Sequence, residues 1–596
     1  MYYQNSKEEC IWIAPRIDIL ARTRNELSTG WGILFKWKDL DGKPHEWAMP
    51  QAMLASKDPS VWLSRLADEG WIGATGTTAR NNLHRYLTSY KTNRRVISVQ
   101  RTGWHKDVFV FPDINIFPLR CFAVGTAGTA GTVNVSADFT CSHTDKRQWE
   151  QREHDKIVLQ TETPQNPYIT GGTLEDWQNT IGTWSENNSR LVLALCAAFA
   201  APLLNIMEHE SFGFNITGKT SSGKSTALQA AASVWGSGAD KGGYFLSWNA
   251  TGNGLEGIAA LHNDTLLCLD EIGQAQGNTV KEAAYMLTNG IGKSRARRDG
   301  SLRTAKIWRC LVLSTGEKGL AEKLKDEGLQ VQAGQLVRLI DIPCDTESDN
   351  GLFDVIHGHT SSQSFADAIK QAASTHYGHA ARAFIKAFQA NRDYAIEKLQ
   401  TGISTDKINE LLPEDDNIDA EVKRVAGHFR LVATAGELAI EWGLVNWGKY
   451  TPFWAVQSCF KAWLNHRGGV GSAEDTAILE KVLKFIEEHG TSRFQNIETD
   501  ERVINRAGFR NKITQDKDEA GVYDAGGTAK TIYYILPEVF KNEVCKGLNP
   551  KKAAKVLFNK GILLKDDANH YARRAPRHLP DYGHKRVYTL VFEHEL

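Results

Sequence analysis

The stretch that decides the fold is FGFNITGKTSSGKSTALQAAASVW, residues 212–235. It joins an apolar run, a loop rich in glycine and hydroxyl groups, and an apolar segment typical of a helix. The loop, from Gly218 to Ser225, fits the pattern G-x-x-x-x-G-K-[ST] in full. In such a loop, backbone N–H groups curl around phosphates, and the following helix begins beneath them. Strand, loop and helix in this order predict a nucleotide-binding site.

Each loop residue has an expected role in binding ATP. The Lys224 ammonium can reach the β- and γ-phosphates, and the Ser225 hydroxyl can bind Mg²⁺. The residues that we expect to contact the nucleotide are Gly218, Lys219, Thr220, Ser221, Ser222, Gly223, Lys224, Ser225 and Thr226. The sequence therefore predicts ATP and Mg²⁺ as the bound groups.

Two further apolar runs end in polar side chains that suit hydrolysis. TLLCLDE, residues 265–271, ends in Asp270, which we expect to hold Mg²⁺ through water, and Glu271, which we expect to polarise the attacking water. CLVLSTGE, residues 310–317, ends in the hydroxyls of Ser314 and Thr315. Either hydroxyl is a candidate for contacting the γ-phosphate or orienting the water, and the alternative is a simple strand-end cap.

Two arginines are candidates for neutralising transition-state charge, which a neighbouring subunit commonly does in ATPases. Arg338 lies in AGQLVRLIDIP, at the start of an expected strand. Arg424 lies at the start of the helical run KRVAGHFRLVATAGELA and would act from a helical lid. A surface position remains the alternative for each.

The apolar runs also predict the fold class. FGFNIT, TLLCLDE, CLVLSTG and VRLIDIP alternate with helical stretches, which indicates an α/β fold with a parallel sheet covered by helices on both faces. Around this core we expect a β-rich N-terminal domain, a helical lid region and a winged-helix-like C-terminal domain. The expected boundaries are 1–175, 176–354 for the ATPase core, 355–475 and 476–596.

Whole-chain composition limits the partners that can be inferred. Seventy Lys and Arg balance seventy Asp and Glu, so only local clusters can argue for nucleic acid. The nine cysteines occur singly, without zinc or redox spacing, which indicates free thiols in a reducing cytoplasm. The apolar run 191–207 contains Pro202 and Asn205 and leads into the nucleotide-binding strand. We therefore interpret it as a buried helix rather than a membrane span, and expect no membrane partner.

A basic segment interrupts the ATPase core. Residues 291–310, IGKSRARRDGSLRTAKIWRC, hold seven Lys or Arg and one acidic residue, with a turn signal at 298–301. A hairpin here would face the channel of a ring and track a DNA backbone, although a solvated surface hairpin is the alternative. The candidate DNA contacts are Lys293, Arg295, Arg297, Arg298 and Arg303.

The C-terminal segment 541–590 is also basic, with twelve Lys or Arg against four acidic residues. A helix over 549–559, a stop at Gly561 and two strands joined by RRAPRHLPDYGHK are typical of a winged helix. A winged helix that contacts only protein is the alternative. The candidate phosphate contacts are Lys551, Lys552, Lys555, Arg573, Arg574 and Arg577.

With these motifs in order, the chain resembles the domain-of-unknown-function 927 family. The matching stretches include RTGW, ESFGFNITGKTSSGKSTALQAAASVWG, WNATGNGLE, LLCLDE, NGIGKSRA, WRCLVLSTGE, AGQLVRLIDIP and HFRLVATAGELA. The resemblance implies an AAA+ ATPase related to the MCM and superfamily 3 replicative helicases of phages and mobile elements. It implies a hexameric ring acting on single-stranded or forked DNA, and it supports Arg338 as the catalytic arginine. This chain shows no primase module, so we expect a separate primase or initiator.

Three functions remain open at this point. The first is an ATP-dependent, ring-forming DNA helicase that replicates a phage or mobile element. The second is an AAA+ initiator, remodelling or defence ATPase that does not unwind DNA. The third is a nucleotide-switched DNA-binding scaffold, against which Glu271 argues, because a switch has little need of a residue that polarises water.

Overall fold

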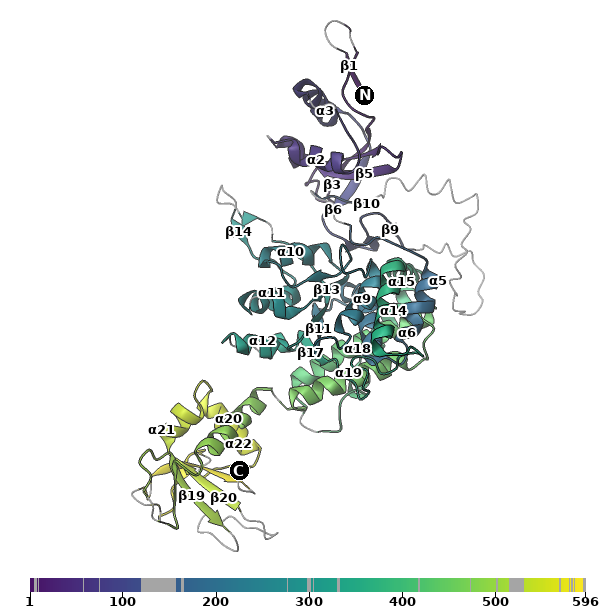
Figure 1. The fold of residues 1–596 in the computed structure, drawn as a ribbon. Helices are drawn as coiled ribbons and strands as arrows, with labels where there is room; N and C mark the ends of the chain where they lie inside the picture. Colours follow the sequence, from purple (N-terminus) through teal and green to yellow (C-terminus); the bar gives the residue numbers. More distant parts are fainter. Residues whose placement is uncertain are drawn as a thin grey trace. The chain divides into compact units, whose positions relative to one another are not determined.

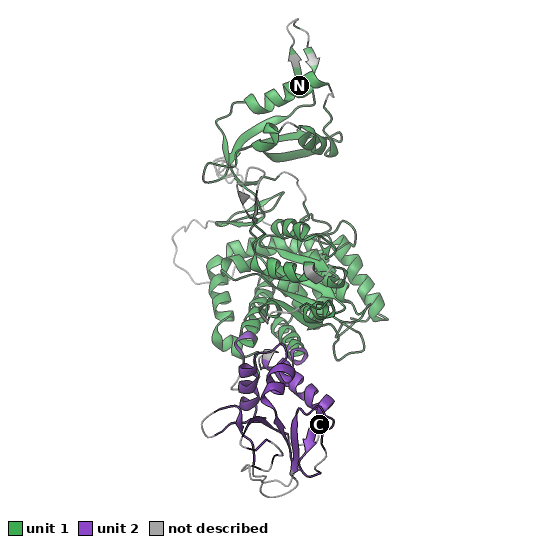
Figure 2. Ribbon diagram, turned by 90° about the vertical axis from the view of Figure 1, so that its left-hand side faces the viewer, with its two compact units in different colours: residues 1–414, 422–463 green, residues 415–421, 464–596 purple. Residues whose placement is uncertain are grey.

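The computed structural model describes the 596-residue chain except residues 5–7, 9, 57, 74–75, 119–156, 162–165, 276, 297–301, 304, 330–332, 416–417, 472, 500–501, 514–529, 567–569, 578, 580–581, 584 and 593–596. The chain divides into two compact units, which Figure 2 shows in different colours. One unit holds residues 1–414 and 422–463, and the other holds residues 415–421 and 464–596.

The chain begins with a sheet of order β10-β6-β3-β4-β5, which combines an antiparallel meander with two parallel strands. Its strands are β3 (Asp18–Arg24), β4 (Gly32–Lys38), β5 (Pro44–Pro50), β6 (Arg95–Val99) and β10 (Ile157–Leu159), and a hairpin of β1 (Tyr2–Gln4) and β2 (Cys10–Trp12) precedes them. The strand content was predicted, but three helices were not: α1 (Gln51–Ala55), α2 (Ser60–Asp68) and α3 (Thr77–Ser89). The sequence of α3, TTARNNLHRYLTS, is mostly polar, and its buried residues are Ala79, Asn82, Leu83 and Leu87. So few apolar positions give only a weak helical pattern in the sequence.

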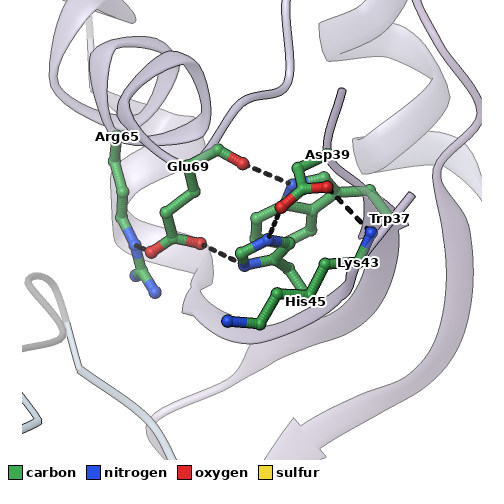
Figure 3. Close-up of polar contacts among 6 residues, drawn as sticks. All are labelled: Trp37, Asp39, Lys43, His45, Arg65 and Glu69. Atoms are coloured by element: carbon green, nitrogen blue, oxygen red, sulfur yellow. Dashed lines mark hydrogen bonds and ion pairs between the residues drawn. The ribbon is translucent and has the colours of Figure 1, made fainter. Parts of the chain in front are cut away.

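A polar cluster joins the β4–β5 hairpin to the end of α2 (Figure 3). The His45 ring lies between two carboxylates, with Nε2 at 2.9 Å from Asp39 Oδ2 and Nδ1 at 3.7 Å from Glu69 Oε2. The ring also stacks on Trp37, with the two ring centroids 5.4 Å apart. The hydrogen bond from His45 lowers the pKa of Asp39. Burial lowers the pKa of Arg65, which pairs with Glu69, to about 10.

The RTGW motif, residues 101–104, forms a turn that anchors this N-terminal part to the central parallel sheet described below. It opens a small sheet of β7 (Gly103–His105), β8 (Val108–Val110) and β9 (Asn115–Ile116). The Trp104 amide donates to Oδ2 of the buried Asp264 at 2.9 Å, and the Trp104 indole donates to the Pro202 carbonyl at 2.7 Å. Gly103 has φ +96°, and a Cβ there would lie 2.4 Å from Asp264 Oδ2. Only glycine therefore fits this position.

The core is a five-stranded parallel sheet of order β12-β13-β16-β11-β17. Its strands are β11 (Phe212–Thr217), β12 (Leu246–Ser247), β13 (Leu266–Asp270), β16 (Leu311–Gly316) and β17 (Leu339–Pro343). The prediction of an α/β fold with a parallel sheet is confirmed, and the four predicted apolar runs form β11, β13, β16 and β17. The short edge strand β12 was not predicted.

Helices cover both faces of this sheet (Figure 1). One face carries α7 (Ser189–Ala200) and α9 (Lys224–Trp235), and the other carries α10 (Gly252–Leu261), α11 (Gly277–Asn289) and α12 (Leu320–Asp326). The apolar run 191–207 contributes α7 and α8 (Leu203–Ile206), and α7 is buried throughout. Within the part of the chain that the structure describes, no helix is long and apolar enough to cross a membrane.

A helical region follows the sheet. It consists of α14 (Ser362–Thr375), α15 (His379–Ala390), α16 (Arg392–Gly402), α17 (Thr405–Asn409), α18 (Ala420–Glu441) and α19 (Thr451–Arg467). Helices α14 and α15 pack against α9, so this region lies on the P-loop helix.

The second unit has a sheet and a helical layer of its own. Its strands are β18 (Phe494–Asn496), β19 (Gly508–Ile513), β20 (Lys530–Ile535), β21 (Leu563–Leu564), β22 (Arg573–Arg574) and β23 (Arg586–Phe592). Its main helices, α20 (Ala473–His489) and α22 (Pro550–Asn559), pack together. The predicted basic helix is α22, capped by the Asn549 side chain, and the predicted strand pair is β22 with β23. The sheet as a whole is larger than that pair.

Candidate nucleotide-binding site

The loop between β11 and α9 has the backbone that its glycines permit. Gly218 has φ +154°, Gly223 has φ +97° and Ser221 has φ +61°. A Cβ at Gly218 would lie 2.1 Å from Cys344 Sγ, so a side chain cannot be added there. Lys224 is only 6% exposed, and its Nζ donates to the carbonyls of Gly218 at 2.8 Å and Lys219 at 2.6 Å. The ammonium therefore lies inside the loop, where phosphate oxygens can replace the carbonyls as acceptors.

Three side chains meet at the carboxyl ends of the central strands. Asp270 Oδ1 accepts hydrogen bonds from Ser225 Oγ at 3.2 Å and from Thr315 Oγ1 at 2.5 Å. Thr315 Oγ1 also accepts from the Glu271 amide at 3.0 Å. The register of β13 and β16 explains this arrangement, because it pairs Leu269 with Ser314 and so sets Asp270 beside Thr315.

The two candidate hydroxyls of β16 have different surroundings. Successive side chains of a strand point to opposite faces of the sheet. Ser314 is fully buried and accepts a hydrogen bond from the Trp248 indole at 2.8 Å, on the face that carries α10 and α11. Thr315 points the other way, toward Asp270. Of the two, Thr315 is the one that contacts the acidic pair.

Glu271 lies just beyond the strand, in a left-handed conformation with φ +58°. Its carboxylate accepts a hydrogen bond from the Gly273 amide at 3.2 Å, which restricts the side chain. It lines a cavity of about 410 Å³ together with the P-loop. The other walls come from Glu317, Asn350, Phe353, Ser362, Gln363, Ala366 and Lys370.

The sequence did not predict these other residues of the cavity wall. Glu317 is hydrogen-bonded by the Thr220 hydroxyl, which joins the end of β16 to the P-loop. Its position two residues after Thr315 was the available signal. Residues 350–370 follow the last core strand and carry no recognisable motif, so only the tertiary packing of α14 on α9 reveals them.

The oxygen donors at the loop suit Mg²⁺. Ser225 Oγ and the Asp270 carboxylate are hard oxygen ligands on adjacent elements. Mg²⁺ typically takes one or two protein oxygens and completes its shell with phosphate and water. Among the described residues there is no group of three or more His, Cys, Asp or Glu that could hold a metal. The described side chains therefore do not form a site that binds a metal through protein ligands alone.

Arg338 and Arg424 lie away from their own P-loop. The Arg338 carbonyl accepts from the Gly213 amide, at the start of β11, whereas the P-loop follows the end of that strand. Both guanidinium groups contact Glu210: Arg338 NH2 lies 3.5 Å from Oε2, and Arg424 NH2 pairs with Oε1. The structure thus brings the two candidate arginines together, at the opposite end of β11 from Lys224.

The basic segment of the core forms the predicted hairpin. β14 (Arg295–Ala296) pairs with β15 (Leu302–Arg303), and an isolated bridge joins Ile291 to Ile307 at the base. Lys293 is exposed and pairs with Glu282 at 2.5 Å. Arg297 and Arg298 lie outside the described residues. Figure 1 shows β14 beyond α10, away from the central strands.

The candidate phosphate contacts of the second unit are mostly exposed. Lys551, Lys552 and Lys555 occupy one face of α22, opposite the buried face that includes Ala553 and Leu557. Arg574 and Arg577 are exposed or partly exposed as well, and Arg573 is half-buried. These basic side chains therefore come from the helix and the β22–β23 region, as the sequence predicted.

Two comparisons match this chain: a solved structure shares its fold, and a family model matches its N-terminal half. A solved structure described as "SCCmec type IV Cch - active helicase" superposes with a TM-score of 0.65, covering 99% of this chain and 97% of that chain at 17% identity. At that identity the likeness concerns the fold. No curated protein matches the chain. Residues 1–129 and 144–307, which include the RTGW turn, the P-loop and the acidic pair, match the family described as a domain of unknown function (DUF927). Through this domain, the chain belongs to the DUF927 family.

Proposed function

We propose that the chain is a ring-forming ATPase of the AAA+ type that moves along DNA and separates its strands, for replication of a phage or mobile element. The observation that carries this proposal is that the P-loop and Glu271 line one cavity, while Asp270 and Thr315 are hydrogen-bonded to Ser225 and to the Glu271 amide at its edge. That set of groups suits hydrolysis of a nucleoside triphosphate, because it provides for phosphate binding, metal binding and water activation.

The role of each group follows from its position. Lys224 exchanges its loop carbonyls for β- and γ-phosphate oxygens, and the backbone of 218–225 surrounds the phosphates. Ser225 and Asp270 hold Mg²⁺, which neutralises charge on the transferred phosphoryl group. Glu271, at the cavity wall, polarises the attacking water, and Thr315 orients Asp270 and the Glu271 backbone.

The arginine positions support assembly into a ring. A strand rises about 3.3 Å per residue, so the start of β11 lies roughly 17 Å from the P-loop, beyond the reach of an arginine side chain. Arg338 and Arg424 therefore act on the nucleotide of a neighbouring copy, and we expect a homohexamer. In this arrangement helices α14–α19 are the lid region, of which α14 contributes to the cavity.

Two basic regions support DNA as the partner. The β14–β15 hairpin carries Arg295 and Arg303 directly opposite each other, which suits contact with a phosphate backbone in the channel of a ring. In the second unit, α22 with β22 and β23 acts as a winged helix that adds affinity without sequence preference. The Cch structure, described as an active helicase, favours strand separation over protein remodelling.

The test is strand separation of forked DNA by the purified chain with ATP and Mg²⁺, using single 3′ and 5′ tails in parallel. Lys224→Ala should abolish ATP binding, and Glu271→Gln should keep binding but block turnover. Strand separation that needs both residues supports the proposal, and the preferred tail gives the polarity. ATP hydrolysis without strand separation on any fork would instead identify an initiator or remodelling ATPase.

A further inference from the structure

Glu210 lies where three separate elements meet. It precedes β11, whereas Arg338 lies in the turn before β17 and Arg424 lies in the first turns of α18. The two arginines contact different oxygens of the Glu210 carboxylate, across 128 and 214 residues of sequence. One carboxylate therefore holds two guanidinium groups side by side, and without it their like charges would push them apart.

The three side chains remain accessible to another molecule. Side-chain exposure is 22% for Arg338, 41% for Arg424 and 35% for Glu210. A guanidinium has five N–H donors, and the hydrogen bonds to Glu210 come from NH2 of each arginine. Donors are thus left for an anionic ligand while Glu210 stays in place.

The groups beneath this cluster add no charge. His428 stacks on Phe212 with ring centroids 4.2 Å apart, and His209 packs edge-on against both rings. Burial, followed by the nearby charge of Arg424, lowers the pKa of His209 to about 4. Burial also lowers the pKa of His428, with His209, Arg424 and Arg338 acting in the same direction. At neutral pH the cluster has two positive charges and one negative charge on an aromatic base.

We propose that Glu210 is a positioning residue that holds Arg338 and Arg424 together as one unit, which binds the γ-phosphate of the neighbouring subunit's ATP. This inference rests on the proposed function, and it adds a residue and a coupling between the two arginines. The fixed carboxylate sets both guanidinium groups in place before the phosphate arrives, so little reorganisation accompanies the transition state. Its loss should therefore lower kcat rather than raise KM.

The first measurement is steady-state ATP hydrolysis, with DNA and Mg²⁺ present, for Glu210→Gln and the matched control Glu208→Gln. Glu208 is an exposed carboxylate two residues away. We expect Glu210→Gln to lower kcat by about tenfold to a hundredfold with little change in KM, because misplaced catalytic groups cost that much. Glu208→Gln should match the wild type. Wild-type kcat in Glu210→Gln would overturn the proposal.

Subunit mixing separates positioning from misfolding. Lys224→Ala subunits cannot hydrolyse ATP but still offer intact arginines to a neighbour. Mixed with them, Glu210→Gln subunits should regain hydrolysis at their own P-loops, as Arg338→Ala subunits should. Absence of this recovery would place the defect in the variant's own P-loop and overturn the proposal.

A mutant cycle tests the coupling. Adding Glu210→Gln to the Arg338→Ala, Arg424→Ala double variant should cause no further loss of activity, because the carboxylate then has nothing to position. A further decrease would indicate a separate structural role and overturn the inference. If Arg338→Ala and Arg424→Ala themselves hydrolyse ATP normally, the trans-acting arginines of the proposed function fail instead.

Discussion

Thr315 donates its hydroxyl proton to Asp270 across a 2.5 Å hydrogen bond between neighbouring strands. The same oxygen accepts the amide of Glu271 at 3.0 Å. One hydroxyl thus fixes the side chain of Asp270, the proposed metal ligand, and the backbone of Glu271, which we propose polarises the attacking water. Ser314, one position earlier, is directed to the opposite face and meets Trp248.

The first prediction separates these two hydroxyls. Thr315→Val keeps the shape of the side chain but removes both hydrogen bonds, so we expect kcat for ATP hydrolysis to fall by about tenfold or more, in line with a displaced catalytic group. Ser314→Ala should leave kcat near the wild-type value and cost about 1–3 kcal/mol of stability, since the buried Trp248 N–H loses its acceptor. The reverse pattern in steady-state kinetics and thermal unfolding would exchange their roles.

The second prediction separates the two acidic residues of the cavity. Glu271→Gln should lower kcat by about 10²- to 10⁴-fold, the range for a lost general base, while ATP binding measured by calorimetry persists. Glu317→Gln is the matched control, because this carboxylate lines the same cavity but is hydrogen-bonded by Thr220. Its kcat should fall by less than about tenfold, as expected for a group outside the proton transfer. A larger decrease in Glu317→Gln would identify it as the base.

The third prediction distinguishes the two basic regions. Alanine at Arg295 and Arg303 should abolish strand separation and DNA-stimulated hydrolysis while basal hydrolysis persists, because in the proposed mechanism the hairpin contacts DNA during translocation. Alanine at Arg574 and Arg577 should mainly weaken DNA binding. The slope of log K against log salt should then become shallower by about 0.7–0.9 for each phosphate that the variant no longer neutralises. Equal strand separation by wild type and the hairpin variant would remove the hairpin from the mechanism.

The sequence was most informative where chemistry constrains it. The pattern from Gly218 to Ser225 and the acid pair at 270–271 predicted the loop, the strands β11 and β13 beside it and the P-loop side of the candidate site, because this spacing is typical of phosphate-binding loops. The choice between Ser314 and Thr315 needed the register of β13 and β16. Successive side chains of a strand point to opposite faces of the sheet, so Ser314 and Thr315 must lie on different faces. The local sequence does not indicate which of these faces carries α9, the helix that follows the P-loop.

Long-range contacts account for what was not predicted. Glu210 has no motif of its own, and the role that we propose for it could be inferred only from the structure, in which Arg338, before β17, and Arg424, in α18, both contact it. The residues that α14 contributes to the cavity could not be predicted either, since Ser362 and Lys370 belong to no motif and occupy ordinary helical positions. In each case, packing between distant segments determines the environment.

The fourth prediction concerns pH. Burial lowers the pKa of His262, which packs against Tyr168 and Tyr244, to about 4. Because the unfolded chain binds the proton from about pH 6.5 downward, the stabilising effect of neutral His262 is complete above that pH and is lost as pH falls toward 4. The upper limit of this effect is about 3 kcal/mol. Burial raises the pKa of nearby Asp264 to about 6, which acts in the opposite sense.

The measured quantity is therefore a difference between variants. The midpoint of urea unfolding should fall less steeply from pH 7 to pH 4.5 in His262→Phe than in the wild type, since the variant has no proton to bind there. Phenylalanine suits the aromatic surroundings and isolates the titration. Parallel pH profiles for the two proteins would show that His262 does not contribute to the acid sensitivity.

The last prediction tests the RTGW turn. Gly103→Ala should lower the thermal unfolding midpoint strongly, because φ is +96° and the added Cβ would lie 2.4 Å from Asp264 Oδ2, a buried carboxylate held by Trp104 and Asn205. Gly42→Ala is the control, with φ +80° and nothing within 4 Å of its Cβ. The control should show only the backbone term of about 1–3 kcal/mol. Equal shifts in the two variants would mean that Asp264 moves aside freely and that the turn is not a rigid anchor for the N-terminal part of the chain.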